Sequence, residues 1–147
     1  MRLTFTKRGG KYDDLLIERQ AAPSESIQCP KQGIIPHDMV HYAVESTLAH
    51  RGFLAMVAGG EAAVFATQGG ESEEAVERLV ECFQAEMWGG RVPAAELLAT
   101  YELACEARGH PAAPVSAEDV AGIRASLDDL TARWTDVPVN GTLTVEF

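Results

Sequence analysis

The stretch RLTFTKRGGKYDDLLIE, residues 2–18, decides the fold because two β-like runs flank a Gly-Gly turn signal. In the first run, residues 2–7, polar and apolar side chains alternate, which places Leu3 and Phe5 on the same face. The second run, residues 12–18, is rich in apolar and strand-forming residues. The pattern predicts a β-hairpin at the start of the chain.

The final residues, 142–147, also alternate apolar and polar side chains, and they follow an Asn-Gly turn signal. An isolated hairpin is marginally stable in water, so a third strand would bury more apolar surface. We therefore expect residues 142–147 to join the N-terminal hairpin in a small antiparallel sheet. We interpret residues 21–33, which contain two prolines and a glycine, as an irregular loop.

Apolar residues between the two ends recur at helical spacing and predict about four helices, with residues 53–58 as an additional helical turn. Ser116 and Asp119 resemble a capping box, with Asp in place of the usual Glu. The apolar stripe that ends at Trp134 could form a coiled-coil seam, but it spans only two heptads, which favours packing inside the fold. The expected helices cover residues 36–50, 72–88, 93–108 and 116–134. The sheet and helices together predict an α+β protein with one domain, residues 1–147.

Composition restricts the classes of partner. The 147 residues carry a formal net charge of −10, which disfavours binding to nucleic acid or to an anionic membrane surface. The longest apolar run, residues 53–58, is too short to cross a bilayer, and the amino terminus lacks the apolar segment of an export signal. Three widely spaced cysteines without a Cys-x-x-Cys pair favour a reducing cytoplasm.

One constellation stands out as a candidate site. His37, His41 and Glu45 follow one another at four-residue spacing, so all three lie along one side of the helix that Pro36 begins. Imidazole nitrogens and carboxylate oxygens are ligands for zinc and similar divalent ions. The pattern favours side chains that pack and form hydrogen bonds, and the alternative is a metal site. The string His37-Asp38-Met39-Val40-His41 also resembles the His-Glu-x-x-His signature of zinc peptidases, with the shorter Asp38 as the candidate general base.

The segment Ile35-Pro36-His37-Asp38-Met39-Val40-His41-Tyr42-Ala43-Val44-Glu45 resembles a segment of small uncharacterised bacterial proteins. The resemblance covers about a dozen residues and implies a bacterial, cytoplasmic setting. It implies no activity.

Other features carry weaker signals. Cys29 lies eight residues before His37 and is a candidate nucleophile, although a single loop cysteine is usually not catalytic. The acidic run that includes Glu77 could attract a cation, but a solvated helix face explains it equally well. The helical positions of Trp88 and Trp134 predict core residues.

Two functional hypotheses follow from the sequence. The first is a binding or interaction domain that contacts another protein, a small molecule or a second copy of itself. The alternative is a metal-binding protein or metal-dependent hydrolase that uses His37, His41 and Glu45, with a divalent metal such as zinc as cofactor. The first predicts an exposed apolar patch, and the second predicts bound metal.

Overall fold

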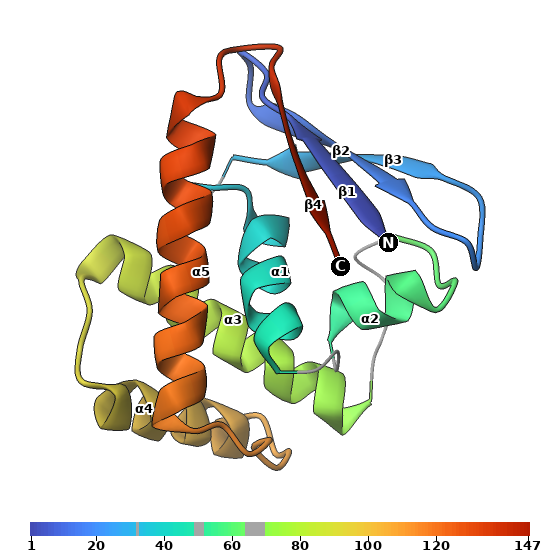
Figure 1. Cartoon of the computed structure of the whole chain (residues 1–147). Coiled ribbons are helices and arrows are strands. Elements are labelled where there is room, and N and C mark those ends of the chain that lie inside the picture. The colour runs from blue at the N-terminus through green and yellow to red at the C-terminus, as the bar shows by residue number, and fades with distance from the viewer. Residues whose placement is uncertain (32, 49–51, 64–69) are drawn as a thin grey trace.

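The computed structural model describes residues 1–31, 33–48, 52–63 and 70–147. Strands β1 (Arg2–Thr6) and β2 (Tyr12–Glu18) form the predicted hairpin, and β4 (Thr142–Glu146) pairs with the free edge of β1. Leu3 is opposite both Ile17 and Val145 in the strand register. The two chain ends therefore lie side by side, as Figure 1 shows, and the predicted pairing of the termini is confirmed.

A fourth strand, β3 (Glu25–Pro30), extends the antiparallel sheet to the order β3-β2-β1-β4. The prediction of an irregular loop was wrong for these residues. Cys29 and Ile27 alternate with the exposed Ser26 and Gln28, so the segment has one inward face, and pairing with β2 supplies the hydrogen bonds. Pro30 is tolerated because β3 is an edge strand, where a missing N–H disrupts no further pairing.

Within the described residues, five helices lie on one side of the sheet (Figure 1). They are α1 (His37–Thr47), α2 (Phe53–Ala58), α3 (Glu71–Gly89), α4 (Ala94–Ala107) and α5 (Ala117–Asp136). The α+β class is confirmed, and each predicted helix is present within a few residues of its expected ends. The expected end of the first helix near residue 50 lies outside the described residues. None of the helices in the described ranges is long and apolar enough to cross a membrane.

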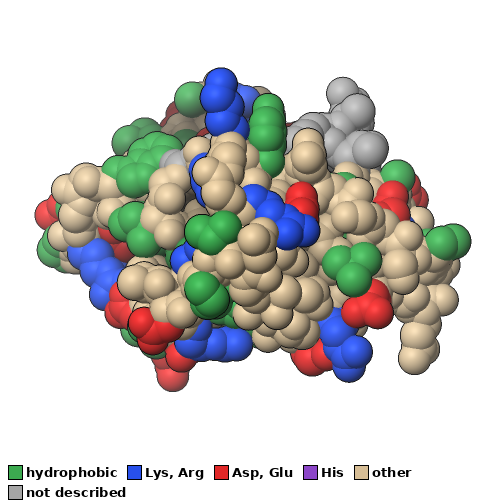
Figure 2. Space-filling view, turned by 90° about the horizontal axis from the view of Figure 1, so that it is seen from above, with side chains coloured by type: hydrophobic (Ala, Val, Ile, Leu, Met, Phe, Trp, Pro, Cys, Tyr) green, Lys and Arg blue, Asp and Glu red, His purple; other side chains and the backbone are tan. Residues whose placement is uncertain are grey.

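The inner face of the sheet and the helices share one hydrophobic core, which includes Leu3, Phe5 and Phe83 with no exposed surface. Helix α5 packs against α1 and α4 through its buried stripe, and Trp134 belongs to the core as predicted. The capping box is formed: Asp119 N donates to Ser116 Oγ, and Ser116 N donates to the Asp119 carboxylate. The face on the sheet side, seen in Figure 2, mixes charged, polar and hydrophobic side chains.

The prediction for Trp88 was wrong, because this side chain is 62% exposed. Its indole lies against the backbone of Gly33, where an added Cβ would be 2.6 Å from the indole nitrogen. Helical spacing alone placed Trp88 with the core residues, but Trp88 lies in the last turn of α3, where Gly89 and Gly90 are exposed as well.

Candidate metal centre

Helix α1 brings two imidazoles to one point. Pro36 occupies the N-cap position with φ −54°, so its missing N–H leaves no helical hydrogen bond unmade. His37 and His41 follow one turn apart, and their Nε2 atoms are 3.2 Å from each other. Val40 and Val44 hold α1 in the core, which fixes the direction in which the imidazoles project.

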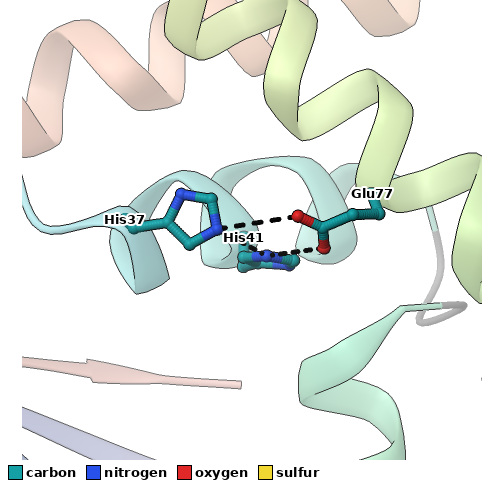
Figure 3. Close-up of side chains that lie close together, drawn as sticks. All are labelled: His37, His41 and Glu77. Carbon is teal, nitrogen blue, oxygen red and sulfur yellow. Dashed lines mark hydrogen bonds and ion pairs between the residues drawn. The ribbon is translucent and has the colours of Figure 1, made fainter. Parts of the chain in front are cut away.

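Helix α3 packs beside α1 and supplies a third group, the carboxylate of Glu77. Glu77 Oε2 is 3.1 Å from His41 Nε2, and Glu77 Oε1 is 3.7 Å from His37 Nε2. Figure 3 shows the three side chains converging from the two helices. We call His37, His41 and Glu77 the His–Glu cluster. One ligand atom from each residue lies within 4.8 Å of the others, which is compatible with binding one metal ion.

The second nitrogen of each imidazole is held by a hydrogen-bond acceptor. His41 Nδ1 is 3.0 Å from the buried Glu45 carboxylate, and His37 Nδ1 is 2.8 Å from Gln84 Oε1. A carboxylate or carbonyl oxygen only accepts, so both Nδ1 atoms carry the hydrogen and donate it. Both Nε2 atoms are therefore the available ligand atoms. Metal-binding histidines commonly have this arrangement, in which the outer partner fixes the tautomer and the ring orientation.

The charges around the cluster set the protonation of its side chains. Burial lowers the pKa of His41, but hydrogen bonds and charges from Glu45 and Glu77 outweigh this effect and raise that pKa to about 10. Burial would raise the pKa of Glu77, yet its contacts with the two imidazoles hold that pKa well below the ordinary range. When no metal is bound, His41 Nε2 carries a proton, which it can donate to the facing acceptor atoms His37 Nε2 and Glu77 Oε2. A divalent ion can take the place of that proton.

The donor separations fit a small divalent ion. Tetrahedral zinc bonds of about 2.0–2.1 Å place neighbouring donor atoms about 3.3 Å apart. His41 Nε2 is 3.2 Å from His37 Nε2 and 3.1 Å from Glu77 Oε2, and one donor atom from each residue lies within 4.8 Å of the others. Two imidazoles and one carboxylate also form a donor set that zinc accepts. The two separations measured from His41 Nε2 are close to those between neighbouring donors of such a site.

The structure brings together two of the three predicted ligands, His37 and His41. Glu45 lies on the opposite nitrogen of His41 and also accepts hydrogen bonds from the backbone N–H groups of Leu54 and Ala55. From the four-residue spacing we expected the Glu45 carboxylate to face a common point with the two imidazoles. The structure places its carboxylate behind the imidazole, as an outer partner.

Asp38 and Cys29 form a separate buried pair. Cys29 Sγ donates to Asp38 Oδ2 at 3.0 Å, so the carboxylate considered as a general base is already engaged by a thiol. Burial, followed by the charge of Asp38, raises the pKa of Cys29 far above its ordinary value. A thiol with a raised pKa is a poor nucleophile, which argues against Cys29 as a catalytic residue.

Glu77 and Gln84 were missed as site residues, although the acidic run containing Glu77 was noted. Glu77 and Gln84 are seven residues apart on α3, so they lie on the same face of that helix. Nothing in the sequence of α3 shows that this face meets the histidines of α1. The chain itself matches no known protein-family model, no curated protein and no solved structure.

Proposed function

We propose that the protein binds a divalent transition-metal ion such as zinc, with His37, His41 and Glu77 as ligands. The observation that carries the proposal is that one donor atom from each of these residues lies within 4.8 Å of the others while the opposite nitrogen of each imidazole is anchored. Both Nε2 atoms and the Glu77 carboxylate face one another, an arrangement that a metal ion would bridge. The acidic character of the chain, with a net charge of −10, also favours a cation.

Three protein ligands leave a coordination position for water or another small ligand. The Glu77 and His37 side chains are 34% and 20% exposed, so the His–Glu cluster is reached from solvent. Two neutral imidazoles and one carboxylate leave a divalent ion with a net positive charge, which suits an anionic or neutral donor in the remaining position. We therefore propose a metal-binding site that accepts an exogenous ligand.

A metal-dependent hydrolase is the finer alternative, because two histidines and a glutamate also hold zinc in hydrolytic enzymes. Hydrolysis needs a base beside the metal-bound water. Asp38, the candidate from the sequence, is bonded to Cys29 and does not belong to the His–Glu cluster. We accordingly favour metal binding over hydrolysis.

Metal analysis of untagged protein tests the proposal. We expect one equivalent of zinc after incubation with excess metal and desalting, and loss of that zinc in the combined His37→Ala and His41→Ala variant. His110→Ala is the matched control, because His110 follows α4 and is not a member of the cluster. Undetectable binding of zinc, cobalt and nickel by the folded wild-type protein would refute the proposal.

An interaction domain is the second candidate function, and the exposure of Trp88 favours it. A tryptophan that is 62% exposed is typical of a contact surface, and Ile34, next to the Gly33 backbone that it touches, is 50% exposed. We propose self-association through this surface as the form to test. Sedimentation should then show a dimer whose dissociation constant rises in Trp88→Ala. A monomer at all concentrations would rule it out.

The same proposal includes a bacterial cytoplasmic location. All three cysteines are free thiols, and Cys29 and Cys105 are buried, which is compatible with a reducing compartment.

A further inference from the structure

We propose that Glu45 is a positioning residue that couples the metal centre to helix α2, so that metal binding stabilises the docking of α2. The inference rests on the proposed function, because it requires a metal at the His–Glu cluster. It adds a consequence of metal binding for a part of the chain that supplies no ligand.

The Glu45 carboxylate joins the two structures directly. Its side chain has no exposed surface, and Oε2 accepts from His41 Nδ1 at 3.0 Å and from Leu54 N at 3.1 Å. Oε1 accepts from Ala55 N, also at 3.1 Å. One buried carboxylate thus orients a metal ligand and satisfies two N–H groups at the start of α2.

Helix α2 depends on this contact. It has only six residues, which is too short to be stable by itself. Gly52, its N-cap residue, provides no side-chain hydrogen bond, so Glu45 replaces the missing cap from another helix. Without Glu45, two N–H groups beside the core would lose their acceptor.

The backbone of Gly52, at the start of α2, packs closely against the Glu45 carboxylate. A Cβ added at Gly52 would lie 2.5 Å from Glu45 Cδ and 2.6 Å from Val76 Cγ1. The φ of Gly52 is −119°, which any residue adopts, so glycine is needed here for space and not for backbone conformation. The Glu45 carboxylate therefore cannot shift without moving the start of α2.

Metal binding acts on His41, which the Glu45 carboxylate connects to α2. Without metal, His41 is held by its contacts with Glu45 and with its neighbours in the cluster. A metal bond to Nε2 fixes the ring in the plane that points Nδ1–H at Glu45, and this reduces the motion of the carboxylate. Coupling is reciprocal, so a well-docked α2 must also favour metal binding.

Gln84 provides a matched comparison. It holds the other imidazole, His37, in the same way, but its side chain lies on α3 and no hydrogen bond in the described structure connects it to α2. Losing either outer partner should weaken metal binding about 10–100-fold. Only the loss of Glu45 should also loosen α2.

Hydrogen exchange with and without zinc tests the inference. In wild-type protein at saturating zinc, we expect the amides of Leu54 and Ala55 to exchange at least about threefold more slowly than in metal-free protein, while those of α4 do not change. Glu45→Gln should remove this zinc effect. Gln84→Met should retain it once zinc is raised to saturation.

If Glu45→Gln does not fold, the comparison of wild-type protein with and without zinc, beside Gln84→Met at saturating zinc, decides the inference. Wild-type protein that binds zinc stoichiometrically, with unchanged exchange at Leu54 and Ala55, would overturn the inference and leave the metal centre intact. Failure to bind zinc at all would instead refute the proposed function. Cobalt absorption, recorded on the same samples, reports occupancy independently of α2.

Discussion

Metal binding at neutral pH should release a proton from His41. The pKa of this imidazole in the metal-free protein is about 10, so at pH 7 almost every molecule carries the proton on His41. Its Nδ1–H is held by Glu45, and the proton lost is therefore the one on Nε2, where the metal binds. We expect about one proton per zinc at pH 7.

The same competition sets the pH dependence of affinity. Between pH 7 and pH 9 the zinc association constant should rise about tenfold per pH unit, because one proton is displaced from His41. At pH 7 the constant should be about a thousandfold below its value above the pKa of about 10. Above that pKa the proton no longer competes.

Isothermal titration calorimetry in buffers with different ionisation enthalpies measures the proton count directly. The slope of observed enthalpy against buffer ionisation enthalpy should be close to minus one at pH 7, because each released proton is taken up by the buffer, and His110→Ala should give the same slope. A slope near zero, together with stoichiometric zinc binding, would show that His41 is neutral before the metal binds. The electrostatic account of the cluster would then be wrong.

Three further predictions concern stability. The raised pKa of His41 stabilises the metal-free protein fully below about pH 6.5, and this stability is lost as the pH rises through about 10. The melting temperature of the metal-free protein should therefore fall between pH 7 and 10. Bound zinc should reduce this fall. Phe83→Ala should lower the free energy of unfolding by about 3–5 kcal/mol in urea, because Phe83 is fully buried, and a loss below about 1 kcal/mol would contradict its place in the core. Ser116→Ala should cost about 1 kcal/mol in the same assay through loss of the capping box, with no change in zinc affinity.

The resemblance to small bacterial proteins, the metal site and the cellular location stay predictions until such measurements are made. Among the structural expectations, those that depend on short-range patterns agreed with the structure. The hairpin follows from strand alternation around a glycine turn, and the cap of α5 follows from Ser116 and Asp119. Each of these features is specified by residues close in sequence.

The errors arise where another part of the chain decides the outcome. The strand β3 has a weak pattern of its own and is formed by pairing with β2. Trp88 lies at a core-like helical position, yet the neighbouring elements do not cover it. Periodicity identifies the faces of a helix or strand but does not show whether something packs against each face.

The features of the candidate site also separate into those that follow from nearby residues and those that depend on distant parts of the chain. The sequence by itself determined that His37, His41 and Glu45 share one side of a helix, because an α-helix repeats every 3.6 residues. Only the tertiary structure decided that Glu77 lies against both imidazoles and that the Glu45 carboxylate lies on the opposite side of His41. The packing of α3 and α2 against α1 sets both, and that packing depends on the whole core and not on the residues of one helix.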